Sequence, residues 1–549
     1  MKKKSAVVVL GCAIVFLLVN LLGCKMELPI YSVAFDSKGG TTVTSQTVQE
    51  EGKSTRPADD PIKTGYVFAG WYASEDALAP VWDFSIPITK DTTLYAKWNP
   101  GSQTLSFDAN DGSGTMTPMP LLTEEVTTLP GNIFIRNGYG FAGWATTSTG
   151  DVAYADLGTY TMGTSSKTLY AKWVIEPITR DVLLAMIEND EDVSFVDTSL
   201  ITDMSSLFLG KTTFDQVISN WDVSSVTNMS SMFEGAEAFN GDISSWNVSS
   251  VTDMSSMFED ADAFNGIISN WDVSKVTDMS SMFEGVDAFN QDISSWNVSS
   301  VTNMNSMFRD ARCFNQDLVS WGDKVSNVTD MGSMFAYTPL FKGDISNWKV
   351  NNVTDMSSMF AHTDLFNNDI STWDVGKVTN MSSMFFDAAV FNQDLVDWDV
   401  SNVTNMSDMF KKAILFNGDI ASWNVSKVIY MSSMFSNAYK FNGNIGSWVV
   451  SSVRAMDNMF RSADLFNQNI GSWVVSSVTC MNFMFYGAQR FNQDISSWDV
   501  GNVQNMDSMF YGATTFNQNL SGWIVSSVTT HTDFSGYSSL VEAHHPVWL

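Results

Sequence analysis

Cysteine, histidine and basic residues are scarce in this chain, and each shortage excludes a class of function. The 549 residues include 4 cysteines and 4 histidines, and no ligand-spaced cluster of Cys or His surrounds any histidine. Lys and Arg number 29 against 60 Asp and Glu, which gives a formal net charge of −31. Because nucleic acid phosphates are bound by clustered basic residues, a nucleic acid partner is excluded.

Long apolar runs are also missing, with one exception at the N-terminus. Three lysines at positions 2–4 precede an apolar stretch at positions 6–19, as in a secretory signal peptide. The tetrapeptide that ends at Cys24, Leu-Leu-Gly-Cys, then resembles a bacterial lipobox, and that resemblance implies cleavage after residue 23 and a lipid on Cys24. The alternative is an uncleaved signal anchor, since residues 5–23 nearly reach the roughly 20 apolar residues that span a membrane. Either segment predicts a body outside the cytoplasmic membrane.

What the chain has in abundance is a short repeat. Tryptophan recurs every 25 residues, with a single step of 27 residues, at the thirteen positions Trp221, Trp246, Trp271, Trp296, Trp321, Trp348, Trp373, Trp398, Trp423, Trp448, Trp473, Trp498 and Trp523. A Met-x-x-Met-Phe element recurs with the same spacing, from residues 204–208 to residues 506–510. A fixed short period of this kind predicts a solenoid, which displays a long surface.

The apolar spacing inside one repeat predicts the shape of a coil. Trp246 and Val248 lie two residues apart, so in a strand they share a face. From Val251 to Phe264 the apolar residues step by three, three, one, three and three, which is typical of one face of a helix. We therefore expect each coil to be a short strand, a turn, a short helix and a return, with identical side chains stacked into buried columns.

The repeat motif resembles a known family. Phe-Asn-x-Asp-Ile-x-x-Trp-x-Val-Ser-x-Val-Thr-x-Met-Ser-x-Met-Phe, which recurs through residues 180–549, closely resembles the repeat of bacterial surface proteins first noted in mycoplasmas and grouped with BspA-type leucine-rich-repeat proteins. The resemblance implies a leucine-rich-repeat-like β/α solenoid on a secreted or lipid-anchored protein, with adhesion as the usual role. This chain departs from the motif at Leu207, at Thr338-Pro339, where proline is expected to interrupt the helix, and at an insertion around Asp323-Lys324, which is expected to kink the stack.

A second, longer repeat precedes the solenoid, at residues 31–98 and 103–173. Each copy contains an aromatic strand, Gly65–Trp71 or Gly138–Trp144, and each closes on Leu-Tyr-Ala-Lys-Trp. These motifs closely resemble the Listeria–Bacteroides repeat, or internalin-type B-repeat, which implies a small β-grasp-like domain used as a spacer or binding module. Asp108–Gly112 lacks the spacing and closing Glu of a calcium loop, so we interpret it as a turn.

Two further segments are expected to cover the ends of the stack. Thr179 can cap a helix through Asp181–Ile187, which predicts an N-terminal cap, and the repeat pattern breaks after Val528, which predicts a C-terminal cap. The predicted organisation is a signal peptide at 1–23, an anchor and tether at 24–30, B-repeat-like domains at 31–98 and 103–173, an N-terminal cap at 177–200, a solenoid of about 13 coils at 201–528 and a C-terminal cap at 529–549.

Polar residues that recur with the repeat have two interpretations. The Asn after the second Phe, such as Asn265, is expected to pair with backbone groups of its own and the next coil. The Asp before Ile, such as Asp242, caps turn amides or, in the alternative, contributes to a metal-binding column. His544-His545 could bind a metal but is more simply an exposed pair. The sequence predicts no metal site.

The remaining cysteines, Cys313 and Cys480, lie 167 residues apart, nearly seven coils. At about 4.8 Å per coil they would be roughly 30 Å apart, whereas disulfide Cα atoms lie within about 7 Å, so no pairing is expected. Cys313 takes the place of Ala263 and Ala288 in neighbouring coils and is expected to act as a small space-filling residue.

Enzymatic motifs are absent from the sequence. There is no GxxxxGK[ST] loop and no GxSxG elbow. The many carboxylates recur with the repeat, whereas a catalytic pair needs two different environments. The sequence therefore predicts no catalytic residue, and no cofactor other than the lipid on Cys24.

One pair of positions varies from coil to coil, namely the two residues directly after each Met-x-x-Met-Phe element. They drift from acidic in early coils, such as Glu259-Asp260, to basic and aromatic in later ones. Aromatic residues and Arg are enriched at interface hot spots, so the candidate ligand-binding residues are Phe386, Arg461, Tyr486 and Tyr511. Plain solvent exposure would also explain free variation at these positions.

Together these features predict a lipid-anchored bacterial cell-surface protein that acts as an adhesin or binding protein through its solenoid. The expected partners are a protein or glycan ligand on a host or neighbouring cell, and the membrane through the lipid. Lys25, which follows Cys24 in place of an acidic residue, favours the outer membrane in a cell that has one. The alternative is a glycan- or polymer-binding accessory lipoprotein of an uptake system.

Overall fold

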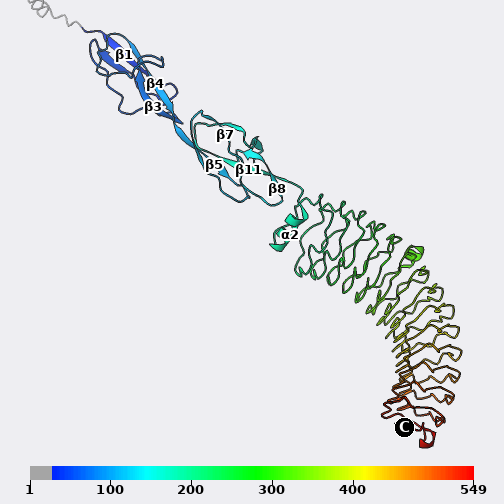
Figure 1. Cartoon of the computed structure of the whole chain (residues 1–549). Helices are drawn as coiled ribbons and strands as arrows, with labels where there is room; N and C mark the ends of the chain where they lie inside the picture. The colour runs from blue at the N-terminus through cyan, green and yellow to red at the C-terminus, as the bar shows by residue number, and fades with distance from the viewer. Residues whose placement is uncertain (1–26, 549) are drawn as a thin grey trace, which may run out of the picture. The chain divides into compact units, whose positions relative to one another are not determined.

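The computed structural model describes residues 27–548 and divides the chain into two compact units, separated between Ile175 and Glu176 (Figure 1). The first unit contains eleven strands and the second the coils. The predictions for the signal peptide and for Cys24 lie outside the described residues. Among residues 27–548 no helix is long and apolar enough to cross a membrane.

The first domain of unit one is a four-stranded mixed sheet. Its strands are β1 (Ile30–Asp36), β2 (Gln46–Gln49), β3 (Tyr66–Tyr72) and β4 (Thr92–Pro100), in the order β2-β1-β4-β3. β1 and β4 pair in parallel, and the outer pairs are antiparallel. Alternation places Val33, Trp71 and Leu94 on the buried face, as period-2 patterning requires.

The second domain repeats this plan with additional strands. β5 (Ser102–Asp108), β6 (Met119–Leu122), β8 (Tyr139–Ala145), β9 (Val152–Tyr154) and β11 (Lys167–Ile175) form a sheet in the order β6-β5-β11-β8-β9, and β7 (Val126–Thr128) pairs with β10 (Thr159–Thr161). Leu105, Trp144 and Leu169 form its core. The structure thus establishes two β-rich domains, while the finer β-grasp-like assignment stays a prediction.

The predicted capping helix begins unit two. α2 (Arg180–Glu188) starts after Thr179, whose hydroxyl accepts from the Val182 N–H at 3.4 Å, so the Thr179-capped helix is confirmed. Its residues Leu183, Met186 and Ile187 are buried in the same core as the coils, and therefore cover the apolar end of the first coil. α2 is the one α-helix among residues 27–548.

The predicted strand and helix within each coil are wrong. Residues 201–528, all of them described, contain no α-helix and only the 3₁₀ helix η1 (Val319–Val325). Each coil instead contributes a single residue, such as Asp253, to a row of isolated parallel bridges. Figure 1 accordingly shows the coils as stacked loops in a curved row. The leucine-rich-repeat-like β/α description is therefore corrected to a solenoid of turns and bridges.

The hydrogen bonds explain why a helix does not form. A helix needs each N–H bonded to the carbonyl four residues earlier. Here the N–H groups of Met254, Ser256 and Phe258 donate to carbonyls of the next coil, at 2.8–3.0 Å. The residues between them close turns, with Met257 N–H on the Met254 carbonyl at 3.2 Å and Ala261 N–H on the Phe258 carbonyl at 2.9 Å. Successive turns of this kind also space apolar residues by three.

The predicted buried columns are confirmed. Trp246, Val248, Met254 and Phe264 are at most 4 % exposed, like their equivalents in other coils. Every one of the thirteen Trp side chains donates its Nε1–H to a carbonyl of the preceding coil, as Trp246 does to Ile218 at 3.1 Å. The column therefore both fills the core and pairs its own polar atoms.

The polar interpretations of the repeat are also confirmed. Asn240 Oδ1 accepts from the Asn265 N–H of the next coil at 2.9 Å, and Asp242 Oδ1 accepts from the Ser244 N–H at 3.0 Å. Cys313 and Cys480 are free, as expected, but Cys313 is exposed, so its space-filling assignment is wrong. Its position lies between the buried Ala311 and Phe314 and faces outward.

The insertion and the C-terminal end are absorbed locally. η1 takes up the two extra residues with Gly322 at φ 25°, and Trp321 still stacks on Trp348 at 5.9 Å. The helix that Pro339 was expected to interrupt does not exist. After Val528 the bridge row continues to Thr530, and Phe534 and Leu540 join the core ahead of η2 (Glu542–His544).

Candidate functional site

The variable strip consists of the two residues after each Met-x-x-Met-Phe element. The first residue points outward from the turn, and the second has a left-handed backbone, as at Asp260 with φ 54°. Glycine fills this second position in several coils, such as Gly235 and Gly285, because it adopts positive φ without steric cost. Since the same turn recurs in every coil, the strip side chains form two parallel rows along the stack.

The four residues predicted from sequence all lie on this strip. Arg461 is exposed, and Phe386, Tyr486 and Tyr511 are half-buried, because each packs against its neighbours along the row. Phe386 lies in the middle coils, whereas Arg461, Tyr486 and Tyr511 lie three to five coils further on. The structure therefore separates the predicted residues into a central group and a C-terminal group.

The C-terminal group is a continuous stack of rings and a guanidinium. Tyr486 stacks on Tyr511 with centroids 5.0 Å apart, and Tyr511 meets Tyr537 edge to face at 5.2 Å. The Arg461 guanidinium lies 5.1 Å from the Tyr486 ring centroid and 5.7 Å from that of Phe483. Partial burial, with Tyr537 and Tyr486 adjacent, raises the pKa of Tyr511 above its ordinary value.

The central group contains residues that sequence reasoning missed. Phe386 meets His362 edge to face at 4.9 Å, and His362 stacks on Tyr337 at 4.3 Å. The Lys411 and Lys412 ammonium groups lie 5.4 and 5.5 Å from the Phe386 centroid. Tyr337, His362 and the lysines stand at strip positions, so the repeat alignment carried their signal, but attention to single aromatic residues passed over them.

A groove opens in this central group, and we call it the notch. The first strip position holds Ala at 336 and 361, where other coils hold larger side chains such as Glu284, Arg309 or Lys411. The resulting hollow has a volume of about 410 Å³ and is lined by Arg309, Ser333, Ala336, Tyr337, Ser358, Ala361, Ser383, Phe386, Asp408 and Lys411. Tyr337 also borders two adjoining hollows of about 270 and 320 Å³.

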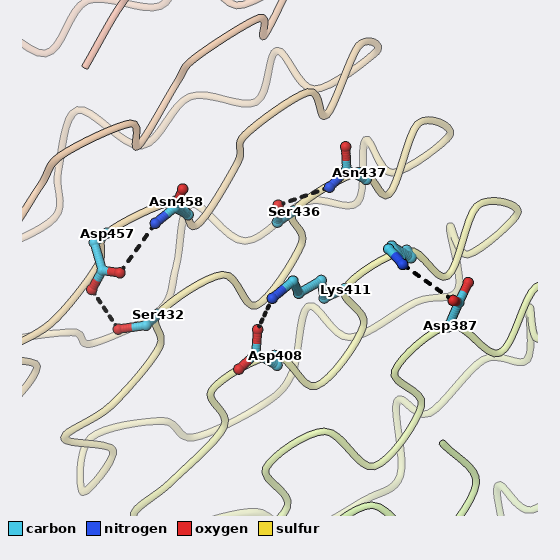
Figure 2. A network of polar contacts seen from close by, with 9 residues as sticks. Asp387, Asp408, Lys411, Ser432, Ser436, Asn437, Asp457 and Asn458 are labelled. Carbon is cyan, nitrogen blue, oxygen red and sulfur yellow. Dashed lines mark hydrogen bonds and ion pairs between the residues drawn. The ribbon is translucent and has the colours of Figure 1, made fainter. Parts of the chain in front are cut away.

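Ion pairs hold the cations at both ends of the notch. Arg309 Nη1 lies 2.6 Å from Glu284 Oε1, and Lys411 Nζ lies 2.7 Å from Asp408 Oδ1. Figure 2 shows Lys411 directed at Asp408, while on the next coil Asn437 bonds Ser436. Each cation is therefore matched by a carboxylate, which leaves the notch polar but close to charge balance.

The N-terminal end of the strip is acidic. Burial, with Glu284 and Glu234 as neighbours in the row, raises the pKa of Glu259 above its ordinary value. Asp262 is raised in the same way, by burial first and then by Asp287. The drift in charge from acidic to basic and aromatic coils is therefore a property of one continuous surface.

Metal chemistry finds little support among the described residues. No group of three or more His, Cys, Asp or Glu side chains within residues 27–548 is arranged to hold a metal ion. His544 Nδ1 contacts Asn517 Oδ1 at 3.2 Å, and His545 Nε2 contacts Ser535 Oγ at 3.0 Å. The two imidazoles thus have separate partners.

Comparison with known proteins identifies both repeats. A family model described as "Mycoplasma protein of unknown function, DUF285" matches residues 181–271, 265–371, 322–405, 357–464 and 431–546. A model of the Listeria–Bacteroides repeat domain matches residues 31–97 and 104–172. Both resemblances noted in the sequence are thereby confirmed. No solved structure matches the chain.

Two similar proteins come from Evansella cellulosilytica. One, named "Putative membrane protein", is 35% identical over 158 residues, which cover 28% of this chain and 24% of that protein. Another, named "Putative Gly-rich membrane protein", is 36% identical over 163 residues, which cover 29% of this chain and 18% of that protein. The chain thus spans about a quarter or less of the length of these relatives. Because the matches of the first family model together cover residues 181–546, the chain belongs to the DUF285 family, with two Listeria–Bacteroides repeat domains ahead of its solenoid.

Proposed function

We propose that this chain is a lipid-anchored bacterial cell-surface protein that binds a protein or glycan on a host or neighbouring cell, as an adhesin. The observation that supports this most is the variable strip: in a solenoid whose core columns hold one residue type, it alone gathers Tyr, Phe, Arg and Lys in contact with one another. The names of the two relatives, both membrane proteins, agree with a location at a membrane. The proposal includes no catalytic step and no cofactor other than the lipid.

Binding is tested on the full chain in detergent micelles, against an array of glycans and extracellular-matrix proteins. The variant with Phe386, Arg461, Tyr486 and Tyr511 all replaced by Ser should lose binding to the ligands that the array identifies. Its thermal unfolding should change little, because these side chains lie on the surface. Unaltered affinity in the folded variant would place the site on another face or in the B-repeat domains.

Anchoring is tested separately. With a lipid on Cys24 and Lys25 after it, the protein should fractionate with the outer membrane of a two-membrane cell. Cys24→Ala should release the protein to soluble fractions or block its processing. A mutant that stays with membranes at the wild-type mass would show that residues 5–23 act as a signal anchor instead.

A second candidate function is a glycan- or polymer-binding accessory role in an uptake system. The aromatic row Tyr337, His362 and Phe386 along the notch favours it, because ring faces bind sugars. The two roles separate in cells that lack the protein. Loss of attachment with normal uptake of soluble polymer indicates an adhesin, and the reverse result indicates the uptake role.

A further inference from the structure

The notch offers matched hydrogen-bond donors and acceptors without a net charge. Arg309 bonds Glu284 through Nη1, which leaves its Nε–H and Nη2–H groups for a ligand. Asp408 bonds Lys411 through Oδ1, which leaves Oδ2 as an acceptor. An ion pair of this kind binds groups that both donate and accept a hydrogen bond, which is the property of a hydroxyl group.

One side of the notch is a row of serine hydroxyls. Ser333, Ser358 and Ser383 occupy the same position in successive coils and line the hollow. Among residues 27–548 none of these three hydroxyl groups has a hydrogen-bond partner, whereas the equivalent Ser281 donates to Glu284 Oε2 at 2.7 Å. The notch therefore contains three unpartnered hydroxyls, spaced by about 4.8 Å, the separation of neighbouring strands.

Ring faces complete the notch. Tyr337 is 45% exposed, and Phe386 closes the end next to Lys411. Tyr337 and His362 have φ of 59° and 58°, at a strip position that Gly, Asn, Asp or Ser occupies in most other coils. Bulky residues in the left-handed region are strained, and such strain is concentrated at functional sites. The surface position gains little packing in return, so the rings are retained at a cost to stability.

We propose that the notch binds a neutral glycan, with one or two sugar rings between Arg309 and Phe386. This inference rests on the proposed binding function and names its ligand class. A gap of two coils, roughly 10 Å long, accommodates two rings of an extended oligosaccharide. The apolar ring faces contact Tyr337 and Phe386, and the sugar hydroxyls bond the serine row, Asp408 and Arg309. An acidic glycan fits less well, because both cations are already paired and the chain carries a net charge of −31.

The test uses the full chain in detergent micelles and immobilised hexasaccharides of β-glucan, α-mannan, β-galactan and chitin, with heparin and polygalacturonate as acidic probes. We expect at least one neutral hexasaccharide to bind with an affinity that changes little with added salt, since no charge is neutralised. The acidic probes should bind more weakly.

Two variants assign the binding to the notch. Ala361→Lys fills the hollow with a side chain that the same row carries at Lys411, and should lower affinity at least about tenfold. Tyr337→Gly removes a ring face while restoring the residue found at Gly285, and should lower affinity without loss of thermal stability. The control is Ser436→Lys, the same change in the same row outside the notch, which should leave binding unaltered.

Three results would overturn the inference. They are binding of the acidic probes alone, binding of neutral glycans that survives both notch variants, and binding of matrix proteins on the array with no neutral glycan bound. In the last two cases the proposed adhesin function stands and only the ligand class or the site falls. A chain that binds nothing on either array contradicts the proposed function as well.

Discussion

The tryptophan of each coil combines a packing role with a hydrogen bond that ties one coil to the next. Trp373 is 2% exposed, and its Nε1–H donates to the Ile345 carbonyl of the preceding coil at 3.3 Å. Its ring stacks on Trp348 with centroids 6.3 Å apart. Because the ring and the N–H both contact the neighbouring coil, the residue stabilises an interface as well as a core.

Trp373→Ala should therefore destabilise the solenoid by about 3–5 kcal/mol, the usual cost of truncating a large core side chain. Trp373→Phe keeps most of the ring but leaves the Ile345 carbonyl without its donor, and should cost about 1–3 kcal/mol. Urea unfolding followed by circular dichroism measures both. Normal unfolding of the alanine variant, or tryptophan fluorescence typical of exposed indoles in the wild-type chain, would contradict the buried column.

At the scale of the element, the sequence predicted which side chains are buried but not the backbone that buries them. The three-residue steps from Val251 to Phe264 fit a helix face and a series of turns equally well. The decision lies in bonds such as Ser256 N–H to Ser280 carbonyl, which join residues in different coils and leave no local signal. The α2 helix was predictable because Thr179 and its apolar face lie within one segment.

The candidate site divides in the same way. Phe386 was visible as an aromatic residue at a variable position, and the structure places it at the end of the notch. The notch itself arises from Ala336 and Ala361, two small residues that draw no attention in the sequence. Their significance appears only once Arg309, which lies beyond the 27-residue step, is aligned with them in one row.

The turn aspartates predict how the solenoid responds to acid. Hydrogen bonds from the serine two residues later, through its hydroxyl and its N–H, hold the pKa of Asp242, Asp292, Asp369 and Asp494 below the ordinary value of 3.8. A folded pKa below the unfolded one adds stability that is present above about pH 4 and lost as pH falls through the folded pKa. The midpoint of thermal unfolding should therefore drop below about pH 4.

Burial has the opposite effect at Glu259, Asp262 and Asp464, whose raised pKa values reduce stability at neutral pH and are relieved on acidification. The control replaces the four turn aspartates by Asn, which accepts the same bond at Asn469 from the Gly471 N–H at 3.0 Å. That variant should lose most of the acid dependence. An identical pH profile in wild type and variant would show that other groups control acid unfolding.

At the scale of the whole molecule, the two compact units should unfold independently. Trp71 lies in the core of the first domain, with its ring 4.9 Å from Phe35 and 5.5 Å from Phe68. Trp71→Ala should lower the first unit's calorimetric transition by an amount equivalent to about 3–5 kcal/mol and leave the solenoid's transition in place. Trp373→Ala should do the reverse. A shift of both transitions in either variant would reveal thermodynamic coupling between the units.

The bonds between coils also have a mechanical consequence. Bonds such as Met254 N–H to Asp278 carbonyl join neighbouring coils and so run along the stack. A load pulling the stack end to end therefore stretches one interface at a time, and each coil that peels away releases 25 residues, or about 80 Å of chain. Tension applied between a tethered N-terminus and a ligand at Tyr337 would act on the coils before residue 337 alone. Those coils would yield in steps and limit the peak force on the bound ligand, so that attachment outlasts a sudden pull.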